Sequence, residues 1–225
     1  MARPRRLSAD QLQPYLLDVP HPRTPPDLLR RQLAEGPSAS LDWAQLFANA
    51  NSVEIEVGFG KGLFLLNECR RRPATNFLGI EIERKYVLLT ASRLAGRQTA
   101  NVRLACTDAH WLLRERVAAG SVAALHVYFP DPWWKKRHRK RCLLTAEFAQ
   151  QCLRVLSPSG RLHFVSDVAE YFAETQEMLA QLTSLHSLPW PEPLDAQDDL
   201  DYLTNFERKY RKEGRPIHRA LYERV

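Results

Sequence analysis

Short apolar runs recur along the chain from residue 53 onward, and stretches with helical spacing separate them. Runs typical of buried strands occupy 53–57, 77–82, 102–106, 123–129 and 161–165. Between these runs apolar side chains recur every three or four residues, the period of an α-helix, as in Leu144, Phe148, Cys152 and Val155. Strands that alternate with helices predict a parallel sheet covered on both faces. We expect a single-domain α/β fold with a Rossmann-like, doubly wound, mostly parallel sheet, and a final strand at 217–222.

The first 50 residues have a different composition. They are rich in Pro and Arg, show weak periodicity, and contain prolines that break any long helix: Pro20, Pro22, Pro25 and Pro26. We expect residues 1–50 to form a basic, partly mobile arm with a short helix near 41–47. Residues 51–225 then form the folded domain.

Composition narrows the class of protein. Hydrophobic residues make up 44% and charged residues 26%, as in a soluble globular chain. The longest stretch without Asp, Glu, Lys or Arg runs from 117 to 130, shorter than the roughly 20 apolar residues that a spanning helix needs. The N-terminal residues lack the apolar run of a secretory signal. The sequence therefore predicts no membrane partner.

The cysteines carry no metal or disulfide pattern. None lies in a Cys-x-x-Cys pair, and the four positions are Cys69, Cys106, Cys142 and Cys152. Reduced cysteines in apolar segments behave as small hydrophobic residues. We expect a cytoplasmic protein without a metal.

The excess of positive charge is concentrated in one place. Of 32 basic and 26 acidic residues, six cations lie between Lys135 and Arg141, where there is no acid, so the remainder is balanced at 26 against 26. Concentrated cations favour a polyanionic partner, nucleic acid first. The alternative is a solvated charged loop.

A glycine-rich turn follows the first predicted strand. Gly58, Gly60 and Gly62 alternate after Glu56, which allows a sharp turn and a close approach to a ligand. A dinucleotide fold would have Gly or Ala where Leu63 stands. The acid before the turn opposes a phosphate and favours a cationic ligand, such as the ammonium and sulfonium of S-adenosylmethionine.

Acidic residues also mark the next two strand ends. Glu81 lies 19 residues beyond Gly62, a spacing that fits an acid accepting ribose hydroxyls. Asp108 follows the third strand, where it accepts from an adenine amino group or, alternatively, caps the following helix. Since ligands of such sheets bind beyond the carboxyl ends of the strands, these acids predict one site.

The fourth strand end combines rigidity, aromatic rings and charge. Asp131 stands between Pro130 and Pro132, and Trp133 and the basic run follow. The prolines restrict the backbone around the carboxylate. Indole rings stack on bases, and cations bind phosphates.

The chain resembles the bacterial tRNA (guanine-N7)-methyltransferases over roughly residues 50–225. The shared motifs are the glycine turn from Glu56 to Gly62, Gly79-Ile80-Glu81, Thr107-Asp108-Ala109, Phe129-Pro130-Asp131-Pro132-Trp133 with its basic run, Ser166-Asp167, and Thr204-Asn205-Phe206-Glu207. The chain departs from the family at Trp134, where Pro or His is more frequent, and at Asn205, where Lys is.

The resemblance implies a fold of the class I methyltransferase type and a reaction that methylates N7 of guanine 46 in the variable loop of tRNA. It implies S-adenosylmethionine contacts from Glu56, Gly58, Gly60, Glu81, Asp108 and Asp131, with Asp131 also catalytic. It implies substrate contacts from Lys135, Asp167, Thr204, Asn205, Phe206 and Glu207. Two purely structural alternatives stay open, because Asp167 with Glu170 and Thr204 with Glu207 both have the spacing of a helix capping box.

Three rival functions belong to other classes. Leu63 argues against a nicotinamide-dependent oxidoreductase, and the acids at successive strand ends argue against an RNA-binding module without catalysis. A methyltransferase acting on another RNA remains an alternative. For the assembly we expect a monomer or a homodimer.

Overall fold

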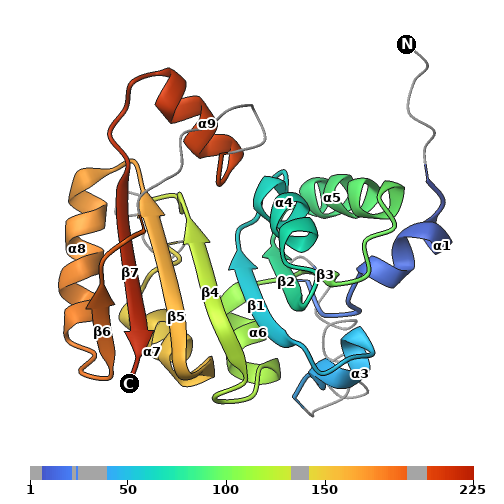
Figure 1. Cartoon of the computed structure of the whole chain (residues 1–225), viewed down its shortest axis with the longest axis horizontal. Coiled ribbons are helices and arrows are strands. Elements are labelled where there is room, and N and C mark those ends of the chain that lie inside the picture. The colour runs from blue at the N-terminus through green and yellow to red at the C-terminus, as the bar shows by residue number, and fades with distance from the viewer. Residues whose placement is uncertain (1–6, 22–23, 25–39, 133–141, 192–201) are drawn as a thin grey trace.

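The computed structural model describes residues 7–21, 24, 40–132, 142–191 and 202–225. In these residues seven strands form one sheet (Figure 1), and their bounds are β1 Ser52–Val57, β2 Thr75–Glu81, β3 Val102–Cys106, β4 Val122–Tyr128, β5 Leu156–Ser166, β6 Leu185–Leu188 and β7 His218–Arg224. The predicted α/β fold is confirmed. The strands expected in the first four runs and in the tail lie within two residues of the observed ones.

The strand order places a ligand site at the centre of the sheet. The order is β3-β2-β1-β4-β5-β7-β6, with β1 to β5 parallel and β7 antiparallel to both of its neighbours. Strands β2 and β3 are added in turn on one side of β1, and β4 then pairs with the other side of β1. Ligands of open α/β sheets bind at the carboxyl ends of the strands where this reversal occurs.

Helices cover both faces, as expected for a parallel sheet (Figure 1). One core cluster joins α4 (Leu63–Arg71) and α5 (Arg84–Gly96) to the sheet. The other joins α6 (Ala109–Arg116), α7 (Ala146–Val155) and α8 (Ala169–Ala180) to the opposite face. Strand β1 is buried on both faces. Its Ile55 and Val57 side chains pack in the cluster with α6, α7 and α8, and Glu54 and Glu56, which alternate with them along the strand, point to the opposite face.

Part of the first 50 residues packs on the edge of the sheet. Helix α1 (Ala9–Leu12) and the 3-10 turn η1 (Gln13–Tyr15) lie beside α5, and Tyr15 is buried. Leu16 forms a parallel bridge to Leu104 on β3, and the Leu17 amide donates to the Leu104 carbonyl at 2.8 Å. The short helix expected near 41–47 is α3 (Trp43–Phe47), capped by the Asp42 side chain.

Strand β5 begins earlier than the sequence predicts. Between two paired positions β4 advances from Val122 to Ala124, while β5 advances from Leu156 to Arg161, so β5 contains a bulge. Ser159 in this bulge has φ of 59°, and the same Ser-Pro-Ser-Gly segment ends α7. A segment that predicts a helix stop is thus also a bulge within a strand.

Helix α9 (Asn205–Lys212) lies between β6 and β7 in the chain and stands over the carboxyl ends of β4 and β5 (Figure 1). Its position completes the edge at which the predicted site residues meet.

Candidate active site

The glycine turn between β1 and α4 is tied to the end of β2. Gly58, Gly60 and Gly62 have φ of 76°, 53° and 71°, conformations that residues with a Cβ rarely adopt. The Gly58 amide donates to the Ile80 carbonyl at 2.8 Å, and the Gly60 amide donates to Glu81 Oε2 at 2.9 Å. A Cβ on Gly62 would lie 2.5 Å from Thr90 Cγ2. The turn therefore holds a fixed backbone surface beside Glu81.

Glu81 is positioned by two backbone amides. Its Oε2 accepts from Gly60, and its Oε1 accepts from Glu83 at 2.9 Å. A carboxylate oxygen can accept two hydrogen bonds, and each oxygen of Glu81 accepts one here, so the group still has acceptor capacity for a ligand hydroxyl. The side chain is buried, which fixes the carboxyl group at the end of β2.

Glu56 is one of four described side chains with a buried polar atom that lacks a hydrogen-bond partner, and it is the one that carries an acid. Its side chain is 3% exposed, and Oε2 has no hydrogen-bond partner among the described residues. Burial, and then the nearby Glu81 carboxylate, raise the pKa of Glu56 well above its usual range. An unpaired buried polar atom costs about 1–3 kcal/mol. A carboxyl group held in this state suits a ligand that brings positive charge to it.

Asp108 caps α6, as the alternative interpretation predicted. Its Oδ1 accepts from the Trp111 amide at 3.0 Å. The preceding Thr107 is buried at the end of β3, and its amide donates to the Glu81 carbonyl at 3.2 Å. The cap fixes the carboxyl group at the same edge as Glu81, and a cap that uses one oxygen leaves Oδ2 for a ligand.

Asp131 lies on a turn that leaves β4 sharply. Phe129 is buried, has φ of 51°, and its amide donates to the Val165 carbonyl at 2.8 Å. This left-handed residue directs Pro130 and Asp131 away from the strand, and the Asp131 side chain is exposed. The neighbouring Trp133, Trp134 and the basic run from Lys135 to Arg141 lie outside the described residues.

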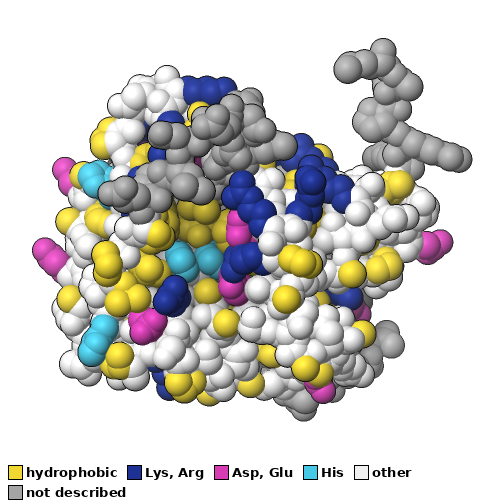
Figure 2. All heavy atoms as spheres, viewed as in Figure 1, with side chains coloured by type: hydrophobic (Ala, Val, Ile, Leu, Met, Phe, Trp, Pro, Cys, Tyr) yellow, Lys and Arg dark blue, Asp and Glu magenta, His cyan; other side chains and the backbone are white. Residues whose placement is uncertain are grey.

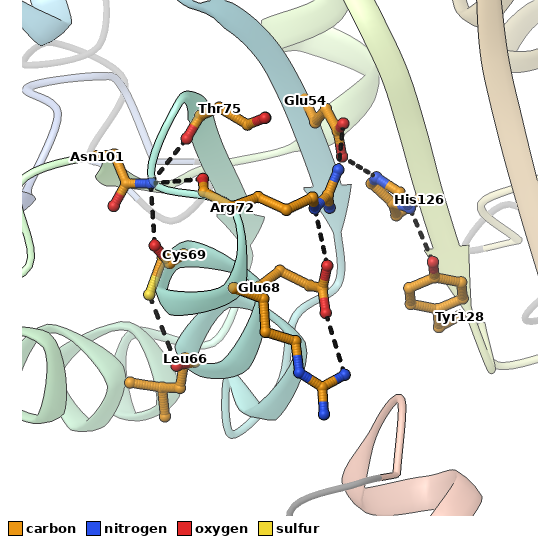
Figure 3. Close-up of polar contacts among 10 residues, drawn as sticks. Glu54, Leu66, Glu68, Cys69, Arg72, Thr75, Asn101, His126 and Tyr128 are labelled. Carbon is orange, nitrogen blue, oxygen red and sulfur yellow. Dashed lines mark hydrogen bonds and ion pairs between the residues drawn. The ribbon is translucent and has the colours of Figure 1, made fainter. Parts of the chain in front are cut away.

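A buried polar network that the sequence analysis missed links α4 to β1 and β4 (Figure 3). Arg72 Nη1 donates to Glu54 Oε1 at 2.5 Å, and His126 Nε2 lies 2.8 Å from Glu54 Oε2. His126 Nδ1 lies 2.7 Å from the Tyr128 hydroxyl, and Arg72 Nε donates to Glu68 at 2.8 Å. The network fixes strand β4 next to Glu56. The signal for it was a Glu at every second position of β1 and a His within an apolar run.

The charges in this network are set by its contacts. Burial alone would raise the pKa of Glu54, but the hydrogen bonds from His126 and Arg72 outweigh burial and lower the pKa to about 2. Burial lowers the pKa of His126, and burial with the nearby His126 lowers the pKa of the stacked His163 to about 3. Glu54 is therefore an anion at neutral pH, and His163 is neutral.

The segment 204–207 divides into two buried anchors and two outward residues. Thr204 Oγ1 accepts from the Glu207 amide at 3.0 Å and caps α9, which is the half of the alternative capping box that Thr204 supplies. The Glu207 carboxylate accepts from the Leu203 amide at 2.7 Å and from Arg219 Nη2 at 2.6 Å. Asn205 accepts from Arg208 at 3.3 Å, whereas Phe206 is 48% exposed.

Asp167 does not cap α8. The N-cap of that helix is Val168, which has no side-chain cap, so the alternative interpretation of Asp167 and Glu170 as a capping box is wrong. The Asp167 carboxylate instead forms an ion pair with Arg215, which follows α9. The pair joins the end of β5 to α9.

Aromatic rings surround the Asp131 turn. The Phe206 ring lies 6.2 Å from that of Phe129 and stacks on Tyr210 at 6.0 Å between ring centroids. The Arg215 guanidinium lies 4.1 Å from the centre of the Tyr210 ring. The exposed Phe206 ring packs on the residue that begins the Asp131 turn, and an exposed ring and an exposed carboxylate are groups that can stack on and hydrogen-bond a base.

Two absences hold for the described residues. They contain no group of three His, Cys, Asp or Glu side chains able to hold a metal ion. None of their helices is long and apolar enough to cross a bilayer.

Comparison with known proteins gives a consistent picture. A family model described as "Putative methyltransferase" matches residues 50–220. A tRNA (guanine-N(7)-)-methyltransferase of Rhodopirellula baltica is 45% identical over 83% of this chain and 71% of its own length. One of Geobacter metallireducens is 32% identical over 84% of this chain and 89% of its own.

Solved structures with the same fold are more distant. The 16S rRNA methyltransferase KamB aligns with a TM-score of 0.60 at 16% identity, over 81% of this chain and 92% of that one. A 16S rRNA (adenine(1408)-N(1))-methyltransferase of Catenulisporales acidiphilia aligns with a TM-score of 0.57 at 19% identity, over 83% and 92%. At this identity the likeness shows the fold alone.

Proposed function

Because the chain belongs to the tRNA (guanine-N(7)-)-methyltransferase family, we propose that it transfers a methyl group from S-adenosylmethionine to N7 of a guanine in tRNA. The position we propose is guanine 46 in the variable loop. The observation that carries the proposal is the unpaired, buried carboxylate oxygen of Glu56, beside Glu81 and the glycine turn at the centre of the sheet.

The residues of this edge fit the methyl donor. Glu56 would accept from its ammonium, Glu81 from its ribose hydroxyls and Asp108 from its adenine amino group. Because Gly58 and Gly60 carry no side chains, the backbone there would leave room for the part of S-adenosylmethionine that joins its ammonium to its ribose. The bound donor supplies an electrophilic methyl group on a sulfonium.

The protein's part in catalysis is positional and electrostatic. Guanine N7 has an in-plane lone pair and no proton, so the residues need not remove one. Asp131 would accept from N1–H and N2–H of the guanine and stabilise the positive charge that the ring gains, a preorganised contribution. Holding the base in line with the methyl group contributes through proximity.

Substrate contacts follow from the same arrangement. We propose that Phe206 and Asn205 contact the RNA directly, and that Thr204 and Glu207 act by holding α9. Lys135 and the cations after it would bind phosphates, and Asp167 would position α9 through Arg215. On the face seen in Figure 2, Lys and Arg side chains gather over α4 and α5, which extends the positive surface available to tRNA.

A reaction assay tests the proposal. The protein is incubated with S-adenosylmethionine labelled in its methyl group and an unmodified tRNA transcript, and the labelled base is mapped. We expect 7-methylguanosine at position 46, and no label in a matched transcript with adenine there. Label in ribosomal RNA but not in tRNA would contradict the proposal. We place the reaction in the cytoplasm, where tRNA is found.

A further inference from the structure

Residues 16–21, which we name the strap, run along the outer edge of β3 toward the carboxyl edge of the sheet. They begin at the bridge from Leu16 to Leu104, and the Leu17 amide pairs with the Leu104 carbonyl. The strap therefore acts as an additional edge segment beside β3, although residues 22–57 separate it from the glycine turn along the chain.

The strap ends against the two strand ends that carry Glu81 and Asp108. Thr107 Oγ1 donates to the Pro20 carbonyl at 2.5 Å. His21 Nε2 lies 2.9 Å from the Ile82 carbonyl. Because a carbonyl only accepts, His21 must carry its proton on Nε2 in this contact.

Together with the backbone, these hydrogen bonds form a closed ring. Glu81 and Thr107 are joined by the Thr107 amide, Thr107 reaches Pro20 through its hydroxyl, and His21 returns to Ile82, next to Glu81. The turn that these contacts hold carries the Glu81 carboxylate, which accepts from the Gly60 and Glu83 amides, and the Ile82 side chain, which is 43% exposed. An exposed large apolar side chain next to a fixed carboxylate suits a ribose with an attached flat base.

We propose that the strap forms the outer wall of the adenosine end of the cofactor site, with Thr107 and His21 as positioning residues that hold the Glu81–Glu83 turn for the ribose. This inference rests on the proposed function, because it takes S-adenosylmethionine as the ligand of that edge. Nothing in the sequence motifs of the glycine turn points to it, since the strap lies in the Pro- and Arg-rich part of the chain.

Paired substitutions separate the hydrogen bonds from packing. Thr107→Val keeps the shape and removes the donor, whereas Thr107→Ser keeps the donor. His21→Leu removes the ring N–H, whereas His21→Gln retains an N–H at a similar reach. Thr175→Val is the matched control, because Thr175 is also buried and donates to the Tyr171 carbonyl at 2.8 Å within α8, which packs near the opposite edge of the sheet from β3.

The readout is affinity for S-adenosylhomocysteine by calorimetry, with KM and kcat for methyl transfer. We expect Thr107→Val and His21→Leu each to weaken binding by about threefold to tenfold, the range for one hydrogen bond. KM for S-adenosylmethionine should rise by the same factor, while kcat at saturation changes by less than about twofold. The Ser and Gln variants should recover parent affinity. Equal affinity in all variants, or equal losses in Thr175→Val, would overturn the inference.

Hydrogen exchange on the unchanged protein gives a second, independent measurement. S-adenosylhomocysteine should slow amide exchange in residues 16–21 as well as in the glycine turn and residues 81–83. Protection of the turn without the strap would also overturn the inference. A parent protein that neither binds S-adenosylhomocysteine nor methylates tRNA would instead refute the proposed function.

Discussion

The two halves of the active-site edge hold their carboxylates in opposite ways. On the β1–β3 side, Glu56 and Glu81 are both buried: backbone amides hold Glu81, whereas Glu56 Oε2 has no hydrogen-bond partner among the described residues. On the β4–β5 side, Asp131 is exposed on a turn that begins at Phe129, whose ring contacts those of Phe206 and Tyr210. A small ligand that enters whole can be matched by buried groups, whereas a base presented by a large RNA must be met at the surface.

The first prediction addresses the exposed half. Asp131→Asn keeps the shape of the side chain, removes its charge and turns an amide donor toward the guanine N–H groups. Single-turnover methyl transfer at saturating tRNA should fall by about two to three orders of magnitude, because a preorganised stabilising group is removed. Binding of tRNA should change far less, since phosphate contacts dominate affinity.

Asp42→Asn is the matched control for that substitution. Asp42 is also exposed and caps α3, and Asn is an equally good cap. Transfer by Asp131→Asn within a few-fold of the parent rate would show that the carboxylate only supports the turn.

The second prediction addresses the buried half. Glu81→Ala removes the proposed acceptor for the ribose and frees the Gly60 and Glu83 amides. Affinity for S-adenosylhomocysteine should fall by on the order of 1.5–3 kcal/mol, the range for hydrogen bonds to a charged group, as measured by calorimetry. Glu170→Ala, an exposed position on α8, should leave it unchanged. Unaltered affinity in Glu81→Ala would remove this residue from the site.

The third prediction concerns pH and Glu56. Its raised pKa means that folding takes up a proton, so the free energy of unfolding falls as pH rises from the ordinary value of 4.5 toward the folded pKa. Glu56→Gln has no such group. It should therefore be more stable than the parent by about 1–3 kcal/mol at pH 8 and by less at pH 5.

Thermal unfolding at several pH values measures this difference, and the same variant should bind the cofactor more weakly. Glu177→Gln, on the exposed side of α8, should leave the pH profile as it is. A stability difference that stays constant from pH 5 to pH 8 would argue that Glu56 is ionised in the free protein.

The smallest effect is expected for single cations of the basic run. Removing one cation that binds a phosphate should flatten the plot of log affinity against log salt by roughly 0.7–0.9. Over a fourfold rise in salt, this is about a threefold change for each of Lys136→Ala, Arg139→Ala and Arg141→Ala. Arg114→Ala, at the far end of α6, should leave the slope unchanged. If all four slopes equal that of the parent, the run is a solvated surface.

Much of the fold could be predicted because most of its elements depend on the spacing of apolar residues and on helix-breaking residues close together in the sequence. The first four strands and α7 follow from apolar periodicity, and the stop after α7 from Ser-Pro-Ser-Gly. The bulge in β5 could not be predicted, since it depends on pairing with β4. Strand β6 was missed because it is only four residues long and only Leu185 among them is buried.

The site shows the same division. Glu56, Glu81, Asp108 and Asp131 stand at or directly after strand ends, so sequence position alone brings them to one edge. The network of Glu54, His126 and Tyr128 depends on which residues face each other across strands. The strap was likewise beyond prediction, because its hydrogen bonds join residues 61 and 87 positions apart.

The antiparallel course of β7 has a consequence for how such a protein can change its substrate. Strand β6 ends, and β7 starts, toward the edge where the parallel strands have their carboxyl ends. The segment that connects β6 to β7 therefore lies next to the candidate active site. A hairpin needs only a few residues to make this connection, but here it carries α9 with Phe206 and Tyr210. Exchange of residues 189–217 between homologues would graft a new recognition element onto an unchanged sheet. If α9 contacts the RNA as proposed, substrate choice can diverge through this one connection while the proposed cofactor half is inherited intact.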